Sequence, residues 1–137
     1  MANEKIKTPQ EIEEINKRVN EFLDLSNYPN VYKDALNLLE QTEVYLKNFH
    51  GQYSSLRDRL RNACLDMISS ITLANAAYNN TNKRIEYLED AFANFQKYKA
   101  LLRVSFNLRQ INSEGLVKLD STLGPVGFQI SGWLKSM

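Results

Sequence analysis

The chain has little of several residue types on which enzymes and secreted proteins depend. Among its 137 residues there is one cysteine, Cys64, and one histidine, His50. A lone thiol cannot close an internal disulfide, and one His with one Cys cannot supply the usual zinc ligands or the Glu-x-x-His pairs of a di-iron bundle. Tyr45 stands where a helical ribonuclease with an Arg-x4-His motif would have its arginine. We therefore expect no metal, no cofactor and no catalytic residue.

Glycine and proline are also scarce, with five and three residues respectively. All-β folds need more of these turn residues, so a sandwich or barrel is disfavoured. No uninterrupted apolar run exceeds three residues, whereas a membrane span needs about 20 and the core of a signal peptide about 7 to 15. We expect a reduced cytoplasmic protein with no membrane segment.

Apolar residues recur at helical spacing in four long segments. The first segment ends at His50-Gly51, the second at residues 79–82, the third near residues 111–113, and the fourth runs to the C-terminal region. Lys99 interrupts the apolar column of the third segment. Short turns favour antiparallel neighbours. The pattern predicts an all-α fold, an antiparallel four-helix bundle over residues 31–137. The expected columns are Tyr32, Ala35, Leu39, Thr42, Leu46 and Phe49; Leu56, Leu60, Ala63, Met67, Ile71, Ala74 and Tyr78; Ile85, Leu88, Phe92, Phe95, Leu102 and Phe106; and Leu116, Leu119, Leu123, Val126, Ile130 and Trp133.

A short additional helix is expected before the bundle. Thr8-Pro9-Gln10-Glu11 combines an N-cap residue, a proline at the first helical position and a glutamate placed to complete a capping box. Residues 26–30 end this helix. We assign residues 1–30 to an acidic N-terminal extension that contains it.

The charges are unevenly distributed although the chain has a net charge of only +1. Residues 1–50 hold six Lys/Arg and nine Asp/Glu, whereas residues 51–137 hold eleven and seven. Arg57 and Arg61 are four residues apart on one predicted helix, and Lys99 and Arg103 are four apart on another, so each pair shares a helix face. These four residues are our candidate contacts for nucleic acid or an acidic protein surface, with an ordinary solvated surface as the alternative.

The C-terminal helix is the candidate oligomer interface. Gly124, Gly127 and Gly132 would let another helix approach closely, and Trp133 is either a lid over the end of the bundle or a subunit contact.

The chain resembles the accessory variability determinant (Avd) proteins of diversity-generating retroelements, four-helix bundles related to ribosomal RNA intervening-sequence proteins. The resemblance covers residues 32–135. It is carried by Tyr32-Lys33-Asp34-Ala35, Leu101-Leu102-Arg103, Leu123-Gly124-Pro125-Val126-Gly127 and Gly132-Trp133-Leu134-Lys135. The last two pieces, which together span residues 123–135, are similar to the family's glycine-rich terminal helix with its Trp-Ile/Leu pair.

The resemblance implies a non-catalytic protein that assembles as a homopentamer. It also implies that the protein binds the retroelement's reverse transcriptase together with template RNA and cDNA and supports mutagenic cDNA synthesis. Carried over by position, Arg57, Arg61, Lys99 and Arg103 become the contacts for RNA, cDNA or polymerase. Two other hypotheses are an intervening-sequence-type bundle of unassigned role and a structural oligomerisation module.

Overall fold

The computed structural model describes residues 6–137, and the first five residues of the predicted N-terminal extension lie outside it. Within the described range the chain is helical and contains no strand, so the all-α prediction is confirmed. The elements are α1 (Pro9–Leu23), α2 (Asn30–Leu46), the short 3-10 helix η1 (Gly51–Tyr53), α3 (Ser54–Ala76), α4 (Thr81–Asn107) and α5 (Ser113–Lys135).

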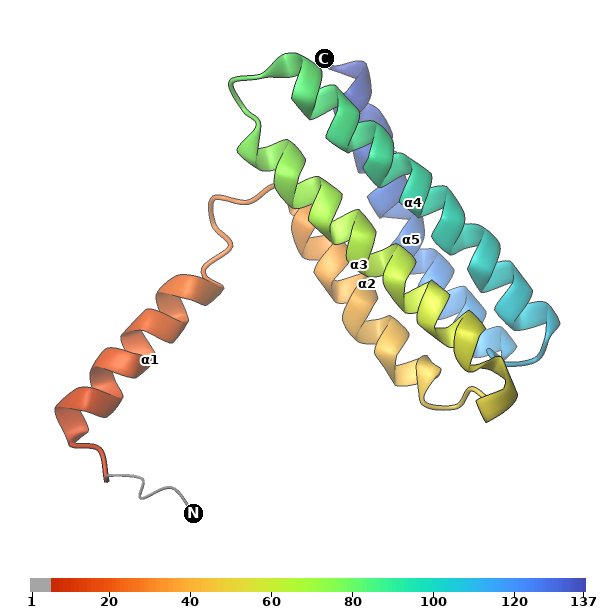
Figure 1. Ribbon diagram of the computed structural model, residues 1–137, viewed down its shortest axis with the longest axis horizontal. Coiled ribbons are helices and arrows are strands. Elements are labelled where there is room, and N and C mark those ends of the chain that lie inside the picture. The colour runs from red at the N-terminus through yellow and green to blue at the C-terminus, as the bar shows by residue number, and fades with distance from the viewer. Residues whose placement is uncertain (1–5) are drawn as a thin grey trace.

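Helices α2 to α5 pack together into what we call the helical body, residues 30–135 (Figure 1). Each helix packs beside the next, and α2 also packs beside α5, whereas α2 and α4 lie diagonally across the core and meet through side chains such as Thr42 and Tyr98. Polar side chains join the first and last helices of this ring, since Gln129 Nε2 donates to Asp34 Oδ2 at 2.7 Å and Thr122 Oγ1 donates to Gln41 Oε1 at 2.7 Å. The four helices therefore enclose one core.

The core consists of side chains that recur every three or four residues on the inner faces of the four helices. Fully buried members include Leu38 on α2, Leu60 and Met67 on α3, Leu88 on α4 and Leu123 on α5. Most of the expected columns lie in this core. Tyr78 does not, because α3 ends at Ala76 and leaves the Tyr78 side chain exposed.

The column of α4 is shifted from the one that the sequence predicts. Tyr98 is completely buried, and Lys99, expected on the column, is exposed. Burying the Lys99 ammonium without a partner would be costly, whereas Tyr98 buries its ring and satisfies its hydroxyl inside the core, where Tyr98 Oη lies 2.7 Å from Thr42 Oγ1. Thr42 donates its own proton to the carbonyl of Leu38 at 2.6 Å, so the tyrosine hydroxyl is the donor of the pair. Burial raises the pKa of the Tyr98 phenol and keeps it protonated.

The end of the body that carries the α4–α5 turn is closed by Gln110. Its side-chain Oε1 accepts a hydrogen bond from the His50 backbone N–H at 2.8 Å, and its own backbone N–H donates to the Ser105 carbonyl at 2.8 Å. Arg109 takes a left-handed conformation with φ 61° to make this turn. Asn112 then caps α5 by accepting from the Gly115 N–H at 2.8 Å. The loops that follow α2 and α4 are thereby held together.

Helix α1 stands apart from the helical body (Figure 1). Its predicted capping box is confirmed, since Thr8 Oγ1 accepts from the Glu11 N–H at 3.2 Å and Glu11 Oε2 accepts from the Thr8 N–H at 3.4 Å. The helix is stabilised locally, because no side chain of α1 is buried.

No helix within residues 6–137 combines the length and the hydropathy needed to cross a bilayer.

Candidate partner-binding groove

The Arg57 and Arg61 side chains form ion pairs with neighbouring carboxylates. Arg61 forms a two-pronged ion pair with Glu43 of α2, with Nε–Oε2 at 2.6 Å and Nη2–Oε1 at 3.0 Å. Asp58 accepts from both arginines, at 3.2 Å from Arg61 Nη1 and 3.2 Å from Arg57 Nε. Two cations and two anions therefore form a balanced cluster across α2 and α3. The hydrogen bond from Arg61 lowers the pKa of Glu43 and raises that of Arg61 itself.

Replacing Glu43 with glutamine should lower the free energy of unfolding at neutral pH by less than about 1 kcal/mol, because the ion pair is half-exposed and screened. The pKa of Glu43 is held below its ordinary 4.5, so its contribution is present above that value and is lost as pH falls through the folded-state pKa. Urea unfolding of both chains across this range should show the difference shrinking in acid. A difference that stays constant below pH 4.5 would contradict the assignment.

Lys99 and Arg103 lie in a different environment. Both are exposed, and neither forms an ion pair with any of residues 6–137. They lie on one side of a groove of about 290 Å³ between α4 and α5, which we call the α4–α5 groove. Its lining consists of Lys99, Leu102, Arg103 and Phe106 from α4 and Leu116, Val117 and Asp120 from α5. The groove thus combines an apolar floor with two available cations and one carboxylate.

The four predicted basic contacts therefore form two separate pairs rather than one surface. Arg61 reaches α2 through Glu43, whereas Lys99 and Arg103 face α5. Since α2 packs beside α3 and α4 beside α5, with α2 and α4 diagonally opposed, these two edges lie on different sides of the body. The position that sequence periodicity placed on the core column, Lys99, is the one that the fold leaves accessible.

Trp133 packs within the helical body as a half-buried side chain against the core. The guanidinium of Arg84 lies over its ring at 5.3 Å, and the same group donates to the carbonyls of Ala74 at 2.9 Å and Asn75 at 3.3 Å. Arg84 thus caps the C-terminal end of α3 and joins it to the end of α5. Of the two roles expected for Trp133, a lid over the end of the helices or a subunit contact, this arrangement corresponds to the lid.

The three glycines predicted at an oligomer interface have different surroundings. Gly127 is buried, and a Cβ added there would lie 2.2 Å from the ring of Phe95 on α4. Its small size serves the packing of α5 against α4. Gly124 and Gly132 are exposed with open space around them. Between these two lies Phe128, whose side chain is 82% exposed. This outer face of α5 is accessible to another molecule.

The thiol of Cys64 is buried between α2 and α3, and burial raises its pKa to about 12. A thiol held protonated in this way is a poor nucleophile at neutral pH. Within residues 6–137 no group of three His, Cys, Asp or Glu side chains could hold a metal ion.

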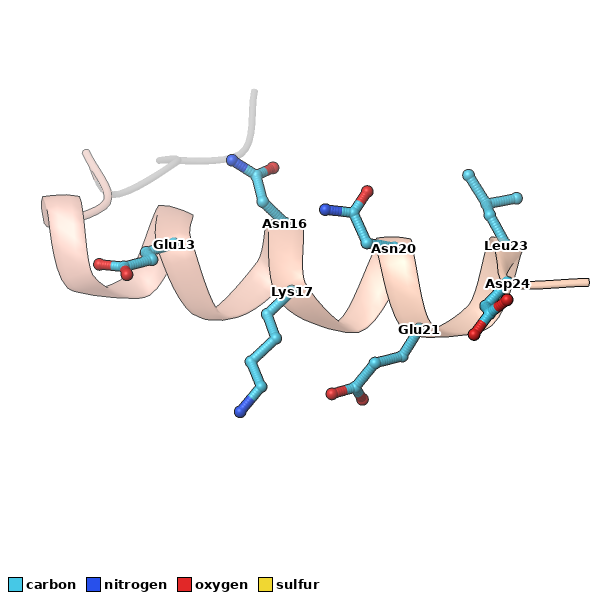
Figure 2. Close-up of a pocket in the computed structure, with 7 residues that line it drawn as sticks. All are labelled: Glu13, Asn16, Lys17, Asn20, Glu21, Leu23 and Asp24. Atoms are coloured by element: carbon cyan, nitrogen blue, oxygen red, sulfur yellow. The ribbon is translucent and has the colours of Figure 1, made fainter. Parts of the chain in front are cut away.

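A polar hollow lies along α1 (Figure 2). Figure 2 shows that its side chains come from a single helix and the residue after it: Glu13, Asn16, Lys17, Asn20, Glu21, Leu23 and Asp24. No second element closes it. It is therefore the solvated face of α1 rather than a ligand cavity, and the α4–α5 groove remains the candidate site.

Sequence reasoning missed the half of the groove that α5 supplies. Val117 is 65% exposed next to the core column that contains Leu116 and Leu119. Val117 widens the apolar face of α5 toward Lys99 and Arg103. The signal for it in the sequence is an apolar residue directly after the column residue Leu116.

Comparison of the chain with models of known protein families and with curated proteins gives no match.

Proposed function

We propose that the chain is a non-catalytic binding protein whose α4–α5 groove contacts an anionic partner. The observation that carries this proposal is the pair Lys99 and Arg103, which are exposed, without ion pairs among residues 6–137, and set beside an apolar floor. Cations of this kind attract phosphate or carboxylate groups, and the apolar floor accepts a base or an apolar side chain.

The identity of the partner comes from the resemblance. We propose that α2 to α5 form an antiparallel four-helix bundle of the accessory variability determinant type. In this proposal the protein acts in the cytoplasm on the reverse transcriptase of a diversity-generating retroelement, its template RNA and its cDNA. The closed ring of contacts among α2, α3, α4 and α5 supports the bundle, and the short turns support its antiparallel order. The polymerase active site belongs to the partner.

Assembly is the second part of the proposal. We propose a homo-oligomer, a pentamer by resemblance, with the outer face of α5 as one contact through Gly124 and Gly132 beside the exposed Phe128. A chain with net charge +1 attracts nucleic acid weakly. Several copies bound to one strand multiply that weak attraction, because every contact after the first is made at a high effective concentration.

Replacing Lys99 and Arg103 together with glutamine should weaken binding of single-stranded RNA, or of polymerase–RNA complex, and flatten its salt dependence. Each phosphate contact in a single strand contributes about −0.7 to the slope of log K against log salt, so losing two should reduce the slope by about 1.4. Both side chains are exposed, so the fold should be unaffected.

The matched control is the double variant Lys97→Gln with Arg59→Gln, which removes the same charge from exposed positions outside the groove. It should retain most of the parental slope. Equal losses in both double variants would mean that the attraction depends on net charge alone. Unchanged binding in the Lys99/Arg103 variant would remove the groove from the site and favour a structural oligomerisation module.

A further inference from the structure

Helix α1 carries an apolar stripe that no part of the described chain covers. Ile12, Ile15 and Val19 are 43 to 48% exposed, and Phe22 and Leu23 are 86% and 63% exposed. At about 100° per residue these five side chains share one face of the helix, and Leu23 stands at the edge that borders the polar hollow of Figure 2. A stripe of this size on a locally capped helix marks a contact surface.

The linker after α1 is folded, and it directs the helix away from its own body (Figure 1). The carboxylate of Asp24 accepts from the Ser26 N–H at 3.0 Å, and the Leu25 carbonyl accepts from the Tyr28 N–H at 3.0 Å. The Tyr28 ring stacks on Tyr32 of α2 at 4.6 Å between centroids. In this arrangement α1 packs against no other helix of the described chain, so its stripe is left open to another molecule.

The α4–α5 groove matches this stripe in polarity and charge. Its floor is apolar, and Lys99 and Arg103 exceed its single carboxylate, Asp120. Helix α1 holds four glutamates against one lysine and one arginine. Of these, Glu11 lies beside the Phe22 edge of the stripe, next to Arg18, and Glu13 and Glu14 lie farther round the helix, one beyond each edge. An acidic amphipathic helix therefore meets a cationic apolar groove.

The lengths also agree. The α4 wall of the groove runs from Lys99 to Phe106, about 10 Å or two helical turns. Ile12 to Val19 on α1 spans the same two turns. Half of the stripe would fill the groove, and the remaining half, with Phe22 and Leu23, would continue along the neighbouring surface.

We propose that α1 of one copy of this chain lies with its apolar face in the α4–α5 groove of a second copy and covers Lys99 and Arg103. This docking regulates access to the proposed binding site. Its regulatory role rests on the proposed function, which assigns partner binding to Lys99 and Arg103. Assembly and contact with an anionic partner then compete for one groove. The contact is head-to-tail, because the two surfaces come from different parts of the chain.

The test uses two full-length variants with opposite defects. The arm variant carries Ile15→Glu with Val19→Glu on α1, and the groove variant carries Val117→Glu on α5. All three positions are exposed, so the helical body should fold normally. The controls are Lys17→Glu on the polar face of α1, which changes the charge by the same two units as the arm variant, and Val44→Glu on the exposed side of α2; both positions lie away from the stripe and the groove.

Sedimentation velocity without nucleic acid, over a concentration series, gives the first result. The parent and both controls should associate beyond the 15.8 kDa monomer, and each test variant should self-associate at least tenfold more weakly. A mixture of the arm and groove variants should regain association, because the intact α1 of the groove variant meets the intact groove of the arm variant. Circular dichroism checks that every chain is folded.

Three results would overturn the docking: a parent that stays monomeric throughout, an arm variant that associates like the parent, or a mixture that regains nothing. The second result would leave assembly to the outer face of α5. Association of the groove variant at parental strength would also overturn it, in favour of pairing between two α1 helices.

Binding of single-stranded RNA, measured where the parent is assembled, separates this inference from the proposed function. With an RNA too short to reach a second copy, so that no contact is multiplied by assembly, the arm variant should bind more tightly than the parent because its groove is uncovered. Equal binding by the two would overturn the covering of Lys99 and Arg103. If neither chain binds RNA while the mixing result holds, the docking stands and the proposed RNA contact fails.

Discussion

Tyr98→Ala should lower the free energy of unfolding by about 3 to 5 kcal/mol, the cost of removing a large aromatic side chain from a closed core. Tyr98 is completely buried on α4. Its hydroxyl makes the only hydrogen bond between α4 and α2 within residues 6–137, to Thr42. The truncation leaves a cavity that the surrounding helices cannot fill. Urea unfolding followed by circular dichroism measures the loss.

Tyr98→Phe is the matched control, since it keeps the ring and removes the hydroxyl. Thr42 would still donate to the Leu38 carbonyl, and only its accepted hydrogen bond would be lost. We expect a loss of about 1 to 2 kcal/mol, as for other buried hydrogen bonds. A Tyr98→Ala chain that is no less stable than the Tyr98→Phe chain would show that the ring is not part of the core.

Gly127→Val should destabilise the protein by about 3 kcal/mol, the upper part of the range for overpacking a core. Even a single Cβ at this position would lie 2.2 Å from the Phe95 ring, so α5 or the ring must move. The same replacement at Gly132, where space is open, should change stability by no more than about 0.5 kcal/mol because glycine and valine are both weak helix formers. Thermal unfolding of the two chains side by side compares them. Equal losses at the two positions would contradict the close approach at Phe95.

The sequence was sufficient to predict the helices and most of the core. Local signals determine both: the capping box of Thr8 and Glu11 sets the start of α1, and columns such as Leu119, Leu123 and Val126 set the buried face of α5. These features depend on residues a few positions apart. They are visible without knowledge of the fold.

The alignment of the α4 column was not predictable in the same way. Both Tyr98 and Lys99 fit a spacing of three or four residues from Phe95 to Leu102. The choice depends on Thr42, 56 residues away, which supplies an acceptor for the tyrosine hydroxyl. An interaction between distant segments cannot be read from periodicity alone.

The grouping of the basic residues depends on tertiary structure for the same reason. Arg57 and Arg61 have the same spacing as Lys99 and Arg103, so the sequence gives both pairs equal weight. Glu43 on α2 forms an ion pair with Arg61 and balances its charge. In the groove, α5 supplies one carboxylate, Asp120, for the two cations Lys99 and Arg103, and neither cation is ion-paired within residues 6–137. The fold thereby distinguishes an internal ion-pair cluster from an available binding groove.

Mapping the RNA contact on the protein tests the central claim most directly. In a titration of the isotope-labelled chain with a single-stranded RNA, followed by amide NMR, the largest shifts should fall on residues 99–106 of α4 and 116–120 of α5, which line the groove. Amides near Glu43, Arg57 and Arg61 should change little, since their charges are already paired. Shifts concentrated at that α2–α3 cluster, or no shifts at saturating RNA, would contradict the account.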